Sequence, residues 1–174
     1  MDELSERQIK ELDIDWYCLI QGKPVHIASS GGMIPEQFRD LKELRFKQDR
    51  VANMEPIAEA KLNIENIQTQ IQEGYEYLQD EMISAAIVDA NRTNPGFVYL
   101  RDYELPVRLF ASTFVEKARK GFRSYIRKEG VEGKDEYILI AEPTKPFRFE
   151  NNQLGLKELE CKMKGDDGFV IEVE

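Results

Sequence analysis

The sequence predicts an α+β fold in which residues 1–174 form one domain, a largely antiparallel sheet with helices packed on it. The first observation is a pair of apolar segments that flank a Gly-containing turn near the N-terminus. The second is a similar pair at the C-terminus, and the third is a set of apolar stripes with helical spacing between them. A chain of this length can bury a core without disulfides or a structural metal.

The first strands and their turn are predicted near the N-terminus. Residues 1–12 are polar with three apolar points, so we expect a short helix or a mobile arm there. An apolar and aromatic run at 14–20 is followed by a turn signal, Gln-Gly-Lys-Pro, and by a second apolar run at 25–28. This pattern predicts a β-hairpin.

A helix is predicted after a loop at 29–32, because Pro35 suits the first position of a helix. It ends before Pro56, since the residue before a proline is driven out of the helical region. Its apolar stripe consists of Phe38, Leu41, Leu44, Gln48 and Val51.

The next segment is ambiguous. Residues 57–90 have an apolar stripe of helical spacing, but the apolar residues of 57–66 also alternate, so both helix and strand remain open there. Gly74 weakens a continuous helix by about 1 kcal/mol relative to Ala. We therefore expect a helix over 75–90.

The second half of the chain predicts a strand, a helix and four more strands. After a turn at 93–96, a strand at 97–105 is expected to bury Phe97, Tyr99 and Tyr103. Pro106 opens a helix that ends near Gly121. The strands that follow are expected at 122–127, 136–141, 156–164 and 169–174, the last two joined by a Gly-Asp-Asp-Gly turn.

The charge is negative and uneven. The net charge of -9 repels nucleic-acid phosphates and anionic lipid, and favours a basic protein partner. Residues 61–90 contain six acids and one base, whereas residues 101–128 contain eight bases and three acids. The two segments either lie close together and partly cancel, or one is a docking surface. For the acidic segment, the candidate binding residues are Glu73, Glu76 and Asp80.

The sequence indicates a cytoplasmic protein. The N-terminus has no basic segment followed by an apolar one, and no apolar run approaches the ~20 residues of a membrane span. Cys18 and Cys161 are far apart in the sequence, and we expect buried free thiols rather than a disulfide.

Candidate catalytic residues are few. His26 is the only histidine, and we expect it at the surface beside a turn, on the strand face opposite Val25 and Ile27. The loop of Ser29, Ser30, Gly31 and Gly32 that follows could supply a nucleophile and backbone N–H groups, or hold a phosphate. It lacks the Gly-x-Ser-x-Gly and Gly-rich phosphate motifs. With one His and two Cys, we expect no metal site and no cofactor.

Aromatic residues offer two further candidates. Trp16 and Tyr17 point to opposite faces of their strand, so we expect one in the core and the other partly exposed as a contact residue. The basic segment 117–128 interleaves Phe122 and Tyr125 with Arg and Lys, which superficially suits a single-stranded nucleic acid. The overall acidity opposes that interpretation.

Two stretches of the sequence carry a family resemblance. The first comprises residues 14–17, 26–32 and Pro35. The second comprises residues 114–125, 137–143 and Pro146. Together they resemble small, acidic bacterial proteins, some of which act as immunity proteins that bind and neutralise a cognate toxin. The resemblance covers about a third of the chain and implies no catalytic residue.

These observations favour a non-enzymatic protein-binding domain of the immunity type with a basic protein partner. One alternative is a small-ligand-binding protein or a small enzyme that uses the loop at 26–32. The other is a nucleic-acid accessory protein that uses the segment 117–128. The sequence leaves the identity of the partner and the oligomeric state open.

Overall fold

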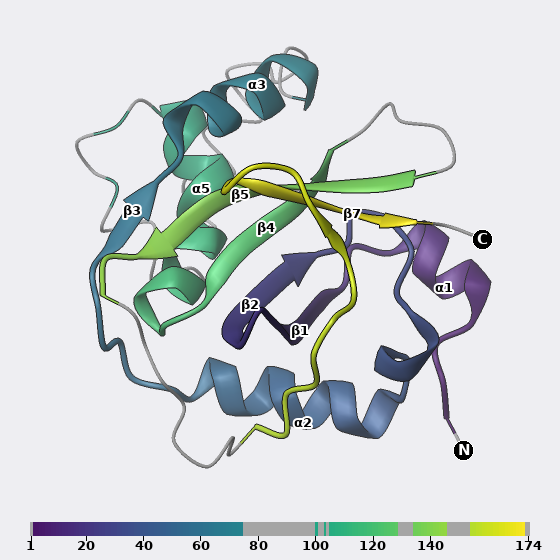
Figure 1. Ribbon diagram of the computed structural model, residues 1–174. Helices are drawn as coiled ribbons and strands as arrows, with labels where there is room; N and C mark the ends of the chain where they lie inside the picture. Colours follow the sequence, from purple (N-terminus) through teal and green to yellow (C-terminus); the bar gives the residue numbers. More distant parts are fainter. Residues whose placement is uncertain are drawn as a thin grey trace.

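A computed structural model describes residues 2–74, 100, 103, 105–128, 134–145 and 154–172. Within these ranges seven strands form one curled sheet in the order β1-β2-β4-β5-β7-β6, with β3 paired to β5 as well (Figure 1). Its strands are β1 (Asp15–Ile20), β2 (Lys23–Ala28), β3 (Ala60–Leu62), β4 (Arg123–Lys128), β5 (Lys134–Pro143), β6 (Lys162–Met163) and β7 (Gly168–Glu172). The predicted α+β class is confirmed, and among the described strand pairs only β2 and β4 run parallel.

Of the helix and the mobile arm left open for residues 1–12, the structure has the helix, and the predicted hairpin is confirmed. α1 (Glu6–Glu11) begins at Ser5, whose side chain and that of Gln8 cap each other's backbone N–H. β1 and β2 pair antiparallel, and Tyr17 lies opposite His26. The turn between them contains Gln21 and Gly22, both with positive φ, as a tight hairpin turn requires.

The predicted helix after Pro35 begins later than expected. Pro35 precedes the short 3-10 helix η1 (Glu36–Phe38), and α2 (Leu41–Ala52) follows. The carboxylate of Asp40 accepts from the backbone N–H of Glu43 at 2.9 Å, so Asp40 rather than Pro35 sets the start of α2. At the other end of α2, Lys120 donates to the carbonyls of Val51 and Ala52.

The ambiguous segment at 57–66 contains both kinds of structure, β3 followed by the start of α3 (Ile64–Gly74). The predicted helix over 75–90 and residues 97–99 of the next predicted strand lie outside the described residues. Tyr103 donates its backbone N–H to Leu100 in a turn and is exposed, so its expected burial in a strand is wrong. α5 (Leu105–Arg119) confirms the helix predicted after Pro106.

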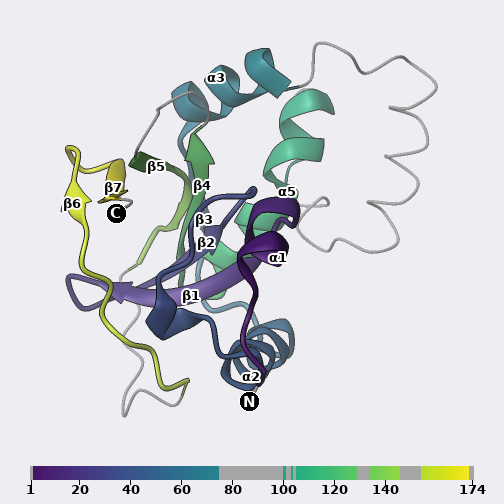
Figure 2. The ribbon, with the colours of Figure 1, turned by 90° about the vertical axis from the view of Figure 1, so that its right-hand side faces the viewer.

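Helices and chain segments cover both faces of the sheet. Figure 2 shows α5 on one side of the sheet; the sheet curls toward the other side, where its own strands β6 and β7 and the segment before β6 lie. α5 packs on β4 and β5 through an apolar cluster that includes Phe110, Phe114 and Ile140. The concave side holds the largest cluster, with Trp16, Tyr125 and other buried residues.

The segment before β6 brings the two ends of the sheet together. Leu19 of β1 donates its backbone N–H to Lys157 and accepts from Leu159, both at 2.8 Å. The strand predicted at 156–164 is therefore divided: its first part bonds to β1, and only Lys162–Met163 pairs with β7. None of the helices in the described ranges has the length and hydrophobicity to span a membrane.

Candidate functional site

Four charged residues from distant parts of the sequence form a row across neighbouring strands. Lys23 lies on β2, Arg123 on β4, Glu142 on β5 and Lys61 on β3. The register pairs Lys61 with Glu142 and sets Arg123 beside Val25 of β2. We call these four residues the charged row.

Arg123 is the most constrained member of the charged row. Its guanidinium donates to the Glu142 carboxylate at 2.5 Å and to the Tyr125 hydroxyl at 3.2 Å. A third bond, of 2.9 Å, goes to the backbone carbonyl of Asp166 in the turn between β6 and β7. Two of its five N–H groups therefore have no partner among the described residues.

Three surface hollows adjoin the charged row. One of 360 Å³ lies between Lys23 and Lys61 and has Pro24 and Pro143 in its wall. Another, of 370 Å³, lies between the β1–β2 turn and the β6–β7 turn, beside Ile20 and Tyr125. The third, of 290 Å³, lies between β3 and β7. All three contain at least two members of the charged row, so they are neighbours on one surface.

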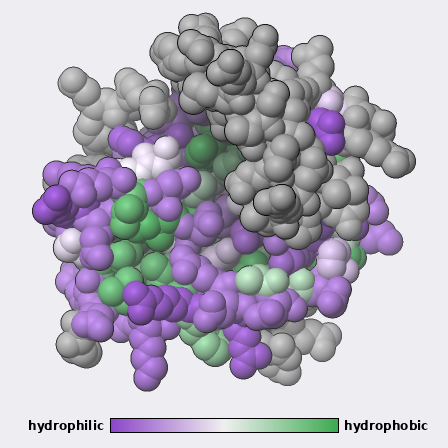
Figure 3. Space-filling model, turned by 180° about the vertical axis from the view of Figure 1, so that it is seen from behind, coloured by the Kyte–Doolittle hydropathy of each residue, from purple (hydrophilic) through white to green (hydrophobic). Residues whose placement is uncertain are grey.

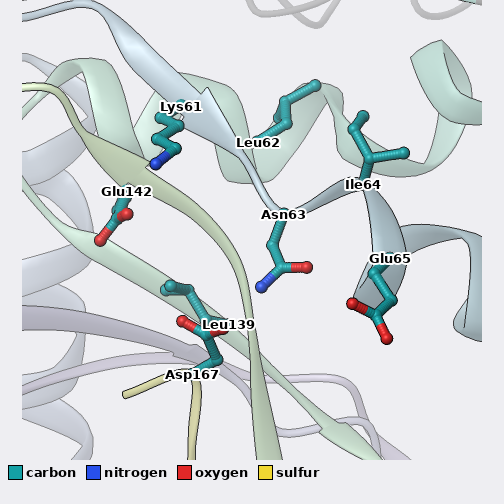
Figure 4. Close-up of a pocket in the computed structure, with 8 residues that line it drawn as sticks. All are labelled: Lys61, Leu62, Asn63, Ile64, Glu65, Leu139, Glu142 and Asp167. Carbon is teal, nitrogen blue, oxygen red and sulfur yellow. The ribbon is translucent and has the colours of Figure 1, made fainter.

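The hollow between β3 and β7 is polar and is closed to an added strand (Figure 4). Lys61 extends toward Glu142 there, and the Asn63 amide and Glu65 carboxylate lie on the other side. The β5 carbonyls at this point accept from Asn63 and Asn66, and the Leu139 N–H donates to Asp167. Because these β5 groups are already bonded, a peptide strand cannot pair with them.

His26 is fully buried, so its predicted surface position is wrong; its placement on the face opposite Val25 and Ile27 is confirmed. Nε2 lies 2.8 Å from an Asp15 carboxylate oxygen and Nδ1 lies 2.5 Å from the Ser124 hydroxyl. An ionised carboxylate only accepts, so Nε2 carries the shared proton.

The arrangement of Asp15, His26 and Ser124 is the reverse of a hydrolytic triad. Such a triad presents its hydroxyl to the substrate and buries its carboxylate. Here Ser124 is fully buried, whereas 41% of the Asp15 side chain is exposed. Burial raises the pKa of Asp15, but the hydrogen bond and charge of His26 outweigh it, so the pKa lies below its usual value. The three residues join β1, β2 and β4.

The loop at 29–33 is packed into the protein. Ser29 is fully buried, and its hydroxyl accepts from the backbone N–H of Ile14. The backbone N–H groups of this loop all donate within the protein, to Ile14 O, Asp13 Oδ1, Leu12 O, Ser29 O and Asp135 Oδ2, in chain order. None of the N–H groups of Ser29, Ser30, Gly31 and Gly32 is therefore available to an oxyanion or a phosphate.

Trp16 and Tyr17 are both buried, so the expectation that one is partly exposed is wrong. Trp16 packs against Phe38 on the concave side of the sheet. Tyr17 packs against Phe122 in a second cluster with Val51 of α2. Because both faces of β1 are covered, neither ring is presented to a partner.

The structure describes the whole basic segment 117–128 but only residues 61–74 of the acidic segment. Glu73 lies in α3, whereas Glu76 and Asp80 lie outside the described residues. In the segment 117–128, Phe122 and Tyr125 are buried and cannot stack on bases. Several bases of this segment have internal partners: Lys120 bonds to Glu116, Arg123 to Glu142 and Arg127 to Asp135.

The charged row was missed by sequence reasoning, and no local motif links its members. Among the described residues, no three His, Cys, Asp or Glu side chains gather closely enough to hold a metal ion. Figure 3 shows the back of the molecule, where hydrophilic residues separate smaller hydrophobic groups.

Comparison of the chain with protein-family models, curated proteins and solved structures gives no match.

Proposed function

We propose that this chain is a non-enzymatic protein-binding domain of the immunity type, which recognises a basic partner through the acidic segment that begins on α3. The net charge of -9 supports a basic partner, since charge complementarity speeds association and suppresses wrong pairings. The proposed location is the cytoplasm, supported by the free thiols of Cys18 and Cys161.

The observation that carries this proposal is the anchoring of α3. Ile67 of α3 is fully buried against the core. The Asn66 amide donates to the Leu139 carbonyl, and the backbone N–H of Asn63 donates to Ile140, both at 2.8 Å. Glu65 and Gln68 are exposed on the other side of the helix. The described start of the acidic segment is therefore held on an anchored helix, and its exposed side chains lose little conformational entropy on binding.

The proposal is tested by measuring partner affinity after charge reversal. A tagged chain is used to isolate the partner from the native host, and the purified pair is then studied by titration calorimetry. The test variant reverses Glu73, Glu76 and Asp80 to Lys. The control variant reverses Glu36, Glu55 and Glu160, three exposed acids that have no ion-pair partner among the described residues.

Both variants change the net charge equally, so long-range electrostatics cancel in the comparison. We expect the test variant to lose affinity by at least about 10-fold and the control variant to lose less than about 3-fold. Equal affinities for the two variants would remove the acidic segment as the binding surface. Circular dichroism of both variants checks that each is folded.

A further inference from the structure

The hollow of 360 Å³ beside the charged row is cationic, although the protein as a whole is acidic. Its lining contains three cations, Lys23, Lys61 and Arg123, and one anion, Glu142. The local formal charge is therefore +2, whereas the net charge of the chain is -9. A local excess of this kind favours a small anion over a long polyanion, which the acidic remainder of the surface would repel.

Hydrogen-bond donors in this hollow are unused. The ammonium groups of Lys23 and Lys61 have neither a hydrogen-bond partner nor an ion-pair partner in the part of the chain that the structure describes. Arg123 keeps two N–H groups beyond its three bonds. Its bonds to Glu142 and Tyr125 hold the guanidinium in place, so binding an anion immobilises no further part of this side chain.

The walls of the hollow add an apolar component. Pro24 and Pro143 line it from β2 and β5, and Gly121 lines it as well. A ligand that fills this space therefore has an apolar body as well as a charged end. Because Glu142 also lines the hollow, a second negative charge on the ligand would face a carboxylate.

We propose that this hollow binds a monocarboxylate with an apolar body, its carboxylate held by Lys23, Lys61 and Arg123 and its body held between Pro24 and Pro143. The carboxylate belongs either to a free small acid or to the C-terminus of a peptide. This proposal does not depend on Glu73, Glu76 or Asp80, so either proposal can fail without the other.

The test is an NMR titration of the ¹⁵N-labelled full chain at constant ionic strength. Benzoate is the probe for a free acid, and N-acetyl-leucine is the probe for a peptide C-terminus. Benzamide and N-acetyl-leucinamide are the matched neutral controls. We expect saturable shifts of the Gly121, Arg123 and Thr144 amides with a carboxylate probe, at a Kd in the range of about 1–10 mM, and little change with its amide.

Two double variants separate this site from general charge effects. Lys23→Ala with Lys61→Ala is expected to weaken carboxylate binding by at least about five-fold. Lys10→Ala with Lys42→Ala removes the same charge from exposed positions on α1 and α2, and is expected to change binding by less than about two-fold. Lys23→Gln with Lys61→Gln repeats the test if the Ala variant does not fold.

Three results would overturn the proposal. One is the absence of saturable shifts up to about 20 mM of either carboxylate. Another is equal binding of a carboxylate and its amide. The third is tighter binding of inorganic phosphate than of either carboxylate, which would assign the hollow to a dianion. Tighter binding of N-acetyl-leucine than of benzoate supports a peptide C-terminus, and the reverse order supports a free acid.

Discussion

The imidazole of His26 donates through Nε2 to the carboxylate of Asp15 at 2.8 Å, and this bond ties a fully buried ring to a partly exposed side chain. The other ring nitrogen is occupied by the Ser124 hydroxyl of β4. Both polar atoms of the ring are thus satisfied inside an apolar environment that includes Tyr17 and Phe114. Because a buried polar atom without a partner is costly, each of these bonds stabilises the junction of β1, β2 and β4.

Replacing Asp15 with Asn should therefore lower stability in a pH-dependent way. The pKa of Asp15 is lowered in the folded protein, where His26 and Lys117 outweigh the effect of burial. A lowered carboxyl pKa adds stability above the unfolded value, about 3.9, and this stability is lost as pH falls through the folded pKa. Asp15→Asn should cost about 1 kcal/mol at neutral pH, allowing for its partial exposure, and less below pH of about 4.

Urea unfolding of wild type and Asp15→Asn, at neutral pH and at about pH 3, measures this difference. Asp49→Asn, at an exposed position of α2, is the control and should change stability little at either pH. A loss for Asp15→Asn that is the same at both pH values would contradict the proposed role of the ionised carboxylate.

The contact between Asp15 and His26 could be predicted from the sequence, whereas the contact between Ser124 and His26 could not. The predicted hairpin with its turn at Gln21 and Gly22 sets Tyr17 opposite His26, and Asp15 then lies diagonally across on the same face. Ser124 reaches His26 only through the parallel pairing of β2 and β4. Nothing local in the sequence specifies a pairing across that separation.

The difference between local contacts and contacts across the sheet also explains which of the other predictions were right. The pattern of apolar residues predicted the first hairpin and α5, because each depends on residues close in sequence. The start of α2 was misplaced because the side-chain cap of Asp40 prevailed over the preference of Pro35. The exposure of Trp16 or Tyr17 was predicted wrongly because a curled sheet with both faces covered is a tertiary property. The charged row likewise depends on strand order.

Lys120→Met should destabilise the protein by about 3 kcal/mol, because it removes a buried cation with several acceptors. The ammonium group donates to the Glu116 carboxylate at 3.1 Å and to the last carbonyls of α2, at Val51 and Ala52. Without it, a mostly buried carboxylate and a helix end lose their donor. Thermal and urea unfolding measure the loss. Lys42→Met, at an exposed position of α2, should change stability by less than about 0.5 kcal/mol.

Gly32→Ala should be more harmful than Gly165→Ala, for steric rather than conformational reasons. A Cβ at Gly32 would lie 2.5 Å from the Arg127 Cδ and 2.9 Å from the backbone oxygen of Ser29, and the loop cannot move away without breaking its own hydrogen bonds. We expect a loss of about 3 kcal/mol. Gly165 has φ of +63 and open space, so Ala there should cost only about 1 kcal/mol. Equal losses in urea unfolding would show that the packing around Gly32 is misjudged.

The two thiols should react at very different rates in the folded protein. Cys18 is fully buried and Cys161 is partly exposed, and burial raises the pKa of both thiols. A raised pKa lowers the thiolate fraction, and burial also blocks access of the reagent, so the Cys18 thiol should not react until the chain unfolds. With Ellman's reagent we expect one slow equivalent in native buffer and two in denaturant. Cys161→Ser should abolish the native reaction and Cys18→Ser should preserve it; the opposite pattern would place the wrong cysteine in the core.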